Sequence, residues 1–207
     1  MPANSQRTKV DHQRSQRFRY DRSEPTVDAT WACEAAAFLN PAAARAPLRR
    51  RERLAQERKN WRKDHPPGFV AKPGTLPDGS TSLMRWSCLV PGKDGTDWEG
   101  GLFPVTMVFG EDYPDSPPVC MLPRGFFHPN VFPCGQICLS LINDYQDWKP
   151  AVTIKQILQG IQELLDTPYI KSPAQEIATR LLQTDMAAYK RGVRDMVQRY
   201  PADRGGS

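Results

Sequence analysis

TIKQILQGIQELL, residues 153–165, has the clearest secondary-structure signal in the chain and decides the class of fold. Its large aliphatic residues recur with the 3.6-residue period of a helix that has one apolar face: Ile154, Ile157, Leu158, Ile161, Leu164 and Leu165. Thr153 and Gln156 form a capping-box pattern, in which each side chain bonds to the backbone N–H of the other residue. The segment therefore predicts a core helix that starts after Thr153.

Two strands are predicted upstream of this helix. Apolar residues alternate along residues 84–90 and again along residues 103–109, and a Gly- and Asp-rich run lies between them. Alternation with period 2 is typical of strands that are buried on one face, so we expect an antiparallel meander. A third apolar run, residues 119–122, follows a proline-rich turn that no regular ladder can include.

Three further helices complete the expected order. Good helix formers run from residue 48 to residue 64, with Leu54 and Trp61 on one side. Ser172, followed by proline, has the pattern of a helix cap, and a last helix is expected over residues 184–199. The order of helix, strands, irregular segment and helices predicts an α+β fold rather than an alternating α/β fold.

Composition divides the chain into three parts. Residues 1–47 are rich in Arg, Ser, Ala and Pro without an apolar period, and we expect a disordered basic extension there, a core domain at 48–201 and a short tail at 202–207. Residues 1–50 contain nine Lys and Arg against five Asp and Glu, while the remainder contains 19 against 18. The domain is thus nearly neutral and has no nucleic-acid-binding motif, and no apolar stretch is long enough for a membrane span. We expect no nucleic-acid or membrane partner.

One of the five cysteines stands in a context that suits chemistry. Cys138 ends the run HPNVFPCGQIC of residues 128–138, where Pro and Gly interrupt regular structure and Asn130 offers an amide to an oxyanion. Cys88 and Cys120 lie within predicted strands and are expected to be buried and inert. No residues have zinc-ligand spacing, so no metal site is expected.

The motif and its surroundings resemble the SUMO-conjugating enzymes, a branch of the ubiquitin-conjugating fold. The resemblance covers residues 53–200 and is carried by LAQERKNWRKDHP at 54–66, PGKDGTDWEGG at 91–101 and HPN at 128–130, with a short segment at 143–147 typical of the SUMO branch. It implies an N-terminal helix, a four-stranded antiparallel meander, an active-site segment and three C-terminal helices.

The resemblance also implies the chemistry. Cys138 would accept SUMO from the activating enzyme as a thioester, and a substrate lysine would then attack it. Asn130 would stabilise the oxyanion or order the nearby loop, and His128 would fix the turn that aims Asn130. A basic surface on the first helix would bind the activating enzyme and a second, noncovalent SUMO. The residues of this surface are Arg58, Lys59, Arg62, Lys63 and His65. From their spacing alone, an ordinary solvated helix face and a docking surface are equally consistent interpretations.

The remaining implied properties concern partners and setting. SUMO ligases and substrate proteins are expected as further partners of a monomer. No cofactor is expected, because ATP would be used by the upstream activating enzyme. Residence in the nucleus and cytoplasm follows from the resemblance and from the absence of an export signal.

The substrate groove departs from the family pattern. The family usually has a tyrosine and an aspartate at Phe132 and Ser172, and basic residues at Val119 and Met121. Cys134 and Gln136 replace smaller hydroxyl residues, and Tyr145 belongs to the same groove. Serine at position 172 would keep the helix cap while the charge is lost. We therefore hypothesise that thioester formation is retained, while direct conjugation to an acid-flanked lysine is slow or depends on a ligase.

Two alternative functions and one question about the Cys138 site remain open at this point. The chain could be a noncatalytic adaptor that binds SUMO or the activating enzyme and competes with an active paralogue, although an adaptor has no need of the Cys138 thiol. It could instead load ubiquitin, which the basic helix and residues 143–147 disfavour. Cys134 could form a reversible disulfide with Cys138, but a neutral substitution is the simpler interpretation.

Overall fold

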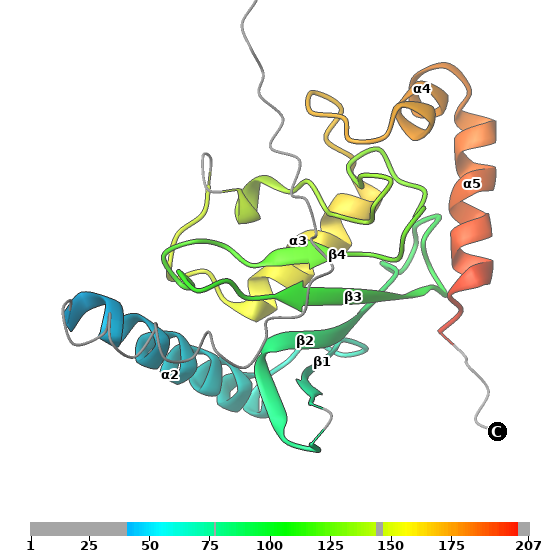
Figure 1. Cartoon of the computed structure of the whole chain (residues 1–207). Coiled ribbons are helices and arrows are strands. Elements are labelled where there is room, and N and C mark those ends of the chain that lie inside the picture. The colour runs from blue at the N-terminus through cyan, green and yellow to red at the C-terminus, as the bar shows by residue number, and fades with distance from the viewer. Residues whose placement is uncertain (1–40, 77, 144–146, 203–207) are drawn as a thin grey trace, which may run out of the picture. The chain divides into compact units, whose positions relative to one another are not determined.

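The computed structural model describes residues 41–76, 78–143 and 147–202. They form the predicted α+β fold (Figure 1). The helices are α2 (Pro41–Lys63), α3 (Ile154–Asp166), α4 (Glu176–Thr184) and α5 (Met186–Arg199), with the short 3-10 helix η1 (Ser140–Ile142). The strands are β1 (Val70–Thr75), β2 (Thr81–Pro91), β3 (Leu102–Val108) and β4 (Val119–Met121). No helix in these residues is long and apolar enough to cross a membrane.

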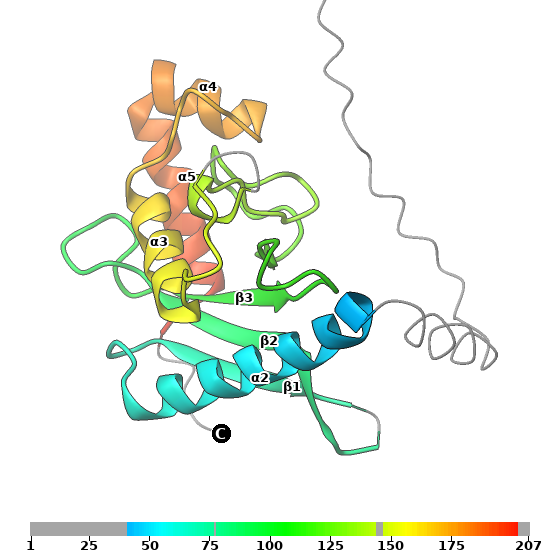
Figure 2. The ribbon, with the colours of Figure 1, turned by 90° about the vertical axis from the view of Figure 1, so that its left-hand side faces the viewer.

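The four strands form one antiparallel sheet in the order β1-β2-β3-β4. The helix α2 lies beside β1 and β2, while α5 lies at the other end of the sheet (Figures 1 and 2). Only the resemblance implied β1, because its sequence VAKPGT has no apolar alternation. Its register shifts between Pro73 and Gly74, a residue pair that weakens strand signals.

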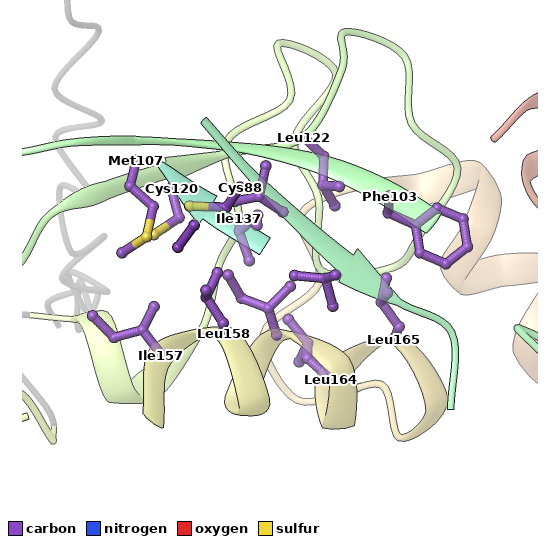
Figure 3. Packing of buried hydrophobic residues seen from close by; sticks show 14 of the residues in the cluster. Cys88, Phe103, Met107, Cys120, Leu122, Ile137, Ile157, Leu158, Leu164 and Leu165 are labelled. Carbon is purple, nitrogen blue, oxygen red and sulfur yellow. The ribbon is translucent and has the colours of Figure 1, made fainter. Parts of the chain in front are cut away.

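The core lies between the sheet and α3, as the apolar period of residues 153–165 predicted. All six periodic residues of α3 are buried, and Figure 3 shows Ile157, Leu158, Leu164 and Leu165 facing the side chains of the sheet. The capping box is confirmed, since the Thr153 hydroxyl accepts the Gln156 N–H and the Gln156 side chain accepts the Thr153 N–H. The capped helix gives the sheet a rigid apolar support.

The buried cysteines belong to this core. Cys88 and Cys120 are both buried and point into the same layer as Met107 (Figure 3). Burial raises the pKa of the Cys88 thiol to about 12 and raises the pKa of Cys120 as well, because the thiolate loses its hydration. Both thiols are therefore protonated and inert at neutral pH, as predicted.

A partly buried ion pair between Arg53 and Glu57 fastens α2 to the start of α3. Leu54 and Trp61 are buried as predicted, and Glu57 on the same face is buried with them. The Glu57 carboxylate accepts hydrogen bonds from the Arg53 Nε at 3.0 Å and from the Ile154 N–H at 3.2 Å. Arg53 also donates to the carbonyl groups of Pro150 and Val152. Arg53 and Glu57 are one helical turn apart, but the backbone groups that they bind lie 97 to 99 positions further along the chain, and no local pattern predicted these bonds.

Several helix boundaries differ from the predictions. α2 begins at Pro41 instead of residue 48, because an alanine-rich stretch of high helix propensity precedes Pro47. The expected extension and tail otherwise consist of residues 1–40 and 203–207, which lie outside the described residues. α5 begins two residues later than expected, at a cap where Asp185 accepts the Ala188 N–H. Within α5, Gly192 leaves room for the ring of Phe127, which a Cβ atom there would meet.

The expected cap at Ser172 is wrong. α4 begins at Glu176, with Gln175 at the N-cap position. The N–H groups of Ala174 and Gln175 both donate to the carbonyl group of Pro129, at 2.7 and 3.1 Å. Because these bonds hold the chain against the 128–130 turn, the helix can start only after them.

We expect Glu57→Ala to lower the free energy of unfolding by about 3 kcal/mol, because it leaves the Arg53 charge and the Ile154 N–H without their buried acceptor. Urea denaturation followed by circular dichroism measures this loss. Glu163→Ala is the matched control, since Glu163 pairs with Lys93 at the surface, where solvent screens the pair and its contribution to stability is small. Equal losses in the two variants would contradict this role of Glu57.

Candidate active site

The segment that carries Cys138 is a short hairpin held against the edge of the sheet. Val131 pairs with Ile137, and Phe132 donates its N–H to the carbonyl group of Gln136 at 2.9 Å. On its other side the hairpin bonds to the chain at β4, since the Ile137 N–H donates to the Cys120 carbonyl at 2.9 Å. These two ladders fix the backbone immediately before Cys138.

The Cys138 thiol is within reach of solvent. The side chain is partly exposed, and its backbone N–H donates to the carbonyl group of Asn130 at 2.8 Å. Its Sγ lies 3.9 Å from the Ser172 hydroxyl. The thiol opens into a pocket of about 460 Å³ lined by Cys138, Leu139, Ser140, Asn143, Asp147, Leu164, Tyr169 and Ser172. A covalent partner can therefore approach the sulfur from this pocket.

Asn130 is the buried centre of the site. Its amide nitrogen donates to the carbonyl groups of Tyr169, at 2.8 Å, and Ser172, at 3.1 Å. Its amide oxygen accepts the Tyr169 N–H at 2.8 Å. Both amide hydrogens are thus used to hold the 169–172 segment over the Cys138 loop. Of the two predicted roles, the geometry favours ordering the loop, because an oxyanion bond would require one of these bonds to open.

The ring of His128 holds the backbone of Asn130 in place. The ring is fully buried, and its Nδ1 accepts the Asn130 N–H at 3.0 Å, so the neutral ring carries its proton on Nε2. Burial lowers the pKa of His128 to about 4, because the charged ring loses its hydration. The resemblance counted His128 with Cys138 and Asn130 as catalytic, in the role of fixing the turn, and its burial excludes contact with a substrate. It is a positioning residue that fixes the turn.

Only part of the predicted groove lines the pocket. Ser172 is one of the lining residues. Gln136 pairs with Met121 and stands across the hairpin from Phe132, and these three residues are outside the lining. Val119 and Cys134 are also exposed. Tyr145 lies outside the described residues, and the disulfide between Cys134 and Cys138 stays a prediction, because both thiols are free here.

The five basic residues of the first helix divide into two groups. Arg58, Arg62 and His65 line a groove of about 560 Å³ between the end of α2 and β1, and the His65 ring stacks on Trp61 with 5.3 Å between ring centroids. Lys59 adjoins this groove in a smaller hollow that it shares with Arg58 and Arg62. Lys63 instead lines a hollow beside Asp64 and Lys155, near α3. Four of the five residues therefore surround one surface.

The burial of His128 predicts a loss of stability in weak acid. The folded pKa of about 4 is below the value of about 6.5 in the unfolded chain, so the unfolded state takes up a proton first as the pH falls. We expect the free energy of unfolding to fall by about 2 kcal/mol between pH 7 and pH 5, as measured by urea denaturation. His128→Gln should abolish this part of the pH dependence, and the exposed-site variant His65→Gln should keep it. The interpretation is wrong if the free energy of unfolding of His128→Gln falls with pH as steeply as that of the wild type.

Comparisons with known proteins agree with this geometry. Residues 53–197 match the family model described as "Ubiquitin-conjugating enzyme". The chain is 58% identical over 152 residues to "SUMO-conjugating enzyme SCE1" of Arabidopsis thaliana, covering 73% of this chain and 95% of that protein. It is 54% identical over 149 residues to "Sumo-conjugating enzyme ubc9" of Dictyostelium discoideum, covering 72% and 94%. The chain therefore belongs to the ubiquitin-conjugating enzyme family, in the branch of the SUMO-conjugating enzymes.

Proposed function

We propose that this chain accepts SUMO from the activating enzyme on Cys138 and transfers it to lysine side chains of substrate proteins. The observation that carries the proposal is the partly exposed Cys138 thiol, held at the mouth of a pocket by the Asn130 turn, in a chain 58% identical to a SUMO-conjugating enzyme. The proposal requires a sulfur atom that a partner can reach, and the partly exposed Cys138 thiol supports it.

The proposed reaction has two acyl transfers at one sulfur. The Cys138 thiolate attacks the thioester carbonyl of SUMO on the activating enzyme, whose thiolate leaves. A substrate amine then attacks the new thioester, an isopeptide bond forms as the nitrogen loses one proton to solvent, and the Cys138 thiolate leaves with its electron pair. ATP is consumed in the earlier activation step, so we propose no cofactor for this chain.

The second step requires a neutral lysine, although a free lysine has a pKa of about 10.4. The apolar side chains of Leu139, Leu164 and Tyr169 line the pocket and lower the pKa of an amine that enters it, because they exclude water. Phe132 has no hydroxyl group, and Ser172 places a neutral hydroxyl rather than a carboxylate beside the thiol. We therefore propose that transfer without a ligase is slow and that ligases supply the missing orientation.

The basic groove supplies the docking surface in this proposal. Arg58, Arg62 and His65 surround one hollow and present positive charge to an acidic partner surface. We assign it to the activating enzyme and to noncovalently bound SUMO. We further propose that the protein is a monomer of the nucleus and cytoplasm. The adaptor alternative receives no support, because the two relatives are named as conjugating enzymes and an adaptor needs no reachable thiol.

We expect the purified chain to form an adduct with SUMO that is cleaved by a reductant when activating enzyme and ATP are present. Cys138→Ala should abolish this adduct, because the acceptor sulfur is gone, and gel electrophoresis with and without reductant measures it. Cys134→Ser is the matched control and should be charged like the wild type, since Cys134 is the other exposed thiol in the described residues. Ubiquitin with its own activating enzyme should give no adduct. An unmodified wild-type chain would refute the proposed function, and charging with ubiquitin alone would assign it to the other branch.

We expect slow ligase-free discharge of this thioester to a peptide whose lysine is flanked by an acidic residue. The double variant Phe132→Tyr/Ser172→Asp should discharge at least about tenfold faster, because it provides polar groups that can orient the attacking amine. Single-turnover discharge, started after charging is complete, separates this step from thioester formation. The relative from Dictyostelium discoideum serves as the reference. If the wild-type chain discharges as fast as that relative, the hypothesis of ligase dependence is wrong.

A further inference from the structure

An exposed apolar strip lies beside Cys138, and none of its residues lines the pocket. It consists of Val108, Val119, Met121 and Phe132, which come from β3, β4 and the hairpin. Val108 is 36% exposed, Val119 44% and Phe132 40%, and Met121 is partly exposed. Large apolar side chains at this exposure indicate a contact surface when they are gathered in one place.

The strand pairing gathers these residues on one face. Val119 pairs with Val108, and Met121 pairs with Gln136. Phe132 stands across the hairpin from Gln136, as their hydrogen bond of 2.9 Å shows. Phe132, Gln136 and Met121 therefore form one row across three neighbouring segments, and Val119 and Val108 belong to the next row.

Alternation along the chain puts Cys138 on the same face as this strip. Cys120 and Ile137 are buried and point into the core (Figure 3), so their neighbours in sequence point outward. Gln136 and Cys138 flank Ile137, just as Val119 and Met121 flank Cys120. An extended peptide with its lysine at Cys138 would thus pass over the strip.

The strip has no charged side chain. Its four residues and the interposed Gln136 are all neutral, whereas Glu111, Asp112 and Asp115 follow β3 in the connection to β4. The exposed Arg85 of β2 pairs with Val108, at the end of the strip away from Met121 and Phe132. In the row of Met121 and Phe132, an acidic side chain would lose hydration without a cation beside it, while an apolar side chain would gain by burial.

We propose that the strip selects substrate lysines that have a large apolar residue two positions away. The spacing follows from the backbone, because residues i and i+2 of an extended chain face the same side about 6.6 Å apart, like Cys138 and Gln136 themselves. The occupant is an extended segment of the substrate protein, and its apolar side chain packs between Met121 and Phe132. The inference rests on the proposed function and names the substrate class of the same site.

The test measures single-turnover discharge of the Cys138 thioester of SUMO to lysine peptides, without a ligase. Each peptide has Leu or Glu at the second position before or after the lysine and small neutral residues elsewhere. We expect one of the two Leu peptides to react at least about fivefold faster than its Glu counterpart, roughly the effect of half-burying a leucine side chain.

Two variants test whether the strip causes this preference. Val119→Lys/Met121→Lys should reverse it in favour of Glu, because it places positive charge on the same face. Leu76→Lys is the matched control, since Leu76 is 45% exposed in the β1–β2 turn, and it should keep the wild-type preference. Charging by the activating enzyme verifies that each variant is folded.

The possible outcomes separate this inference from the proposed function. If the chain is charged with SUMO but the Leu and Glu peptides react equally, or Glu reacts faster, the inference is overturned and the proposed function stands. A Leu preference that survives Val119→Lys/Met121→Lys also overturns it, because the preference then arises elsewhere. If the wild-type chain is not charged with SUMO, the proposed function fails, and the inference fails with it.

Discussion

The site depends on the buried amide of Asn130. Its side chain makes three hydrogen bonds to the backbone of Tyr169 and Ser172, and its own carbonyl group accepts the Cys138 N–H. One residue thus joins the turn, the thiol and the segment that forms the far wall of the pocket. Because these partners are backbone groups, the geometry is largely independent of the side chains at 169–172. His128 completes the arrangement by accepting the Asn130 N–H within the core.

Local signals in the sequence predicted the parts of this structure that depend on neighbouring residues. The capping box and apolar period of α3 act within one or two helical turns, so Thr153 and Ile154 could be assigned correctly from their spacing. The strands β2 and β3 alternate because one face is buried. The segment around Cys138 is accessible, as predicted, but the expectation that Pro and Gly keep it out of a ladder is wrong, because Val131 pairs with Ile137 and Met121 pairs with Gln136.

Contacts between distant residues decided the features that the sequence did not reveal. Glu57 looks like an ordinary solvated helix residue, but it is buried because Ile154, 97 positions away, donates to it. The Ser-Pro pair at 172 has the local pattern of a helix start. The carbonyl group of Pro129 overrides that pattern by binding the N–H groups of Ala174 and Gln175. In both cases the partner is set by tertiary packing, which a local pattern cannot encode.

The two halves of the proposed reaction are held by different parts of the molecule. Groups that position the Cys138 thiol, Asn130 and His128 among them, are fully buried, so a change there would disturb the core. Residues that would contact the substrate segment with the lysine, such as Val119 and Phe132, are two-fifths exposed. They can change with little loss in the free energy of unfolding. The side chains of the substrate groove can therefore change while the loop that carries Cys138 keeps its structure. This separation explains how thioester chemistry and acceptor choice can diverge within one fold.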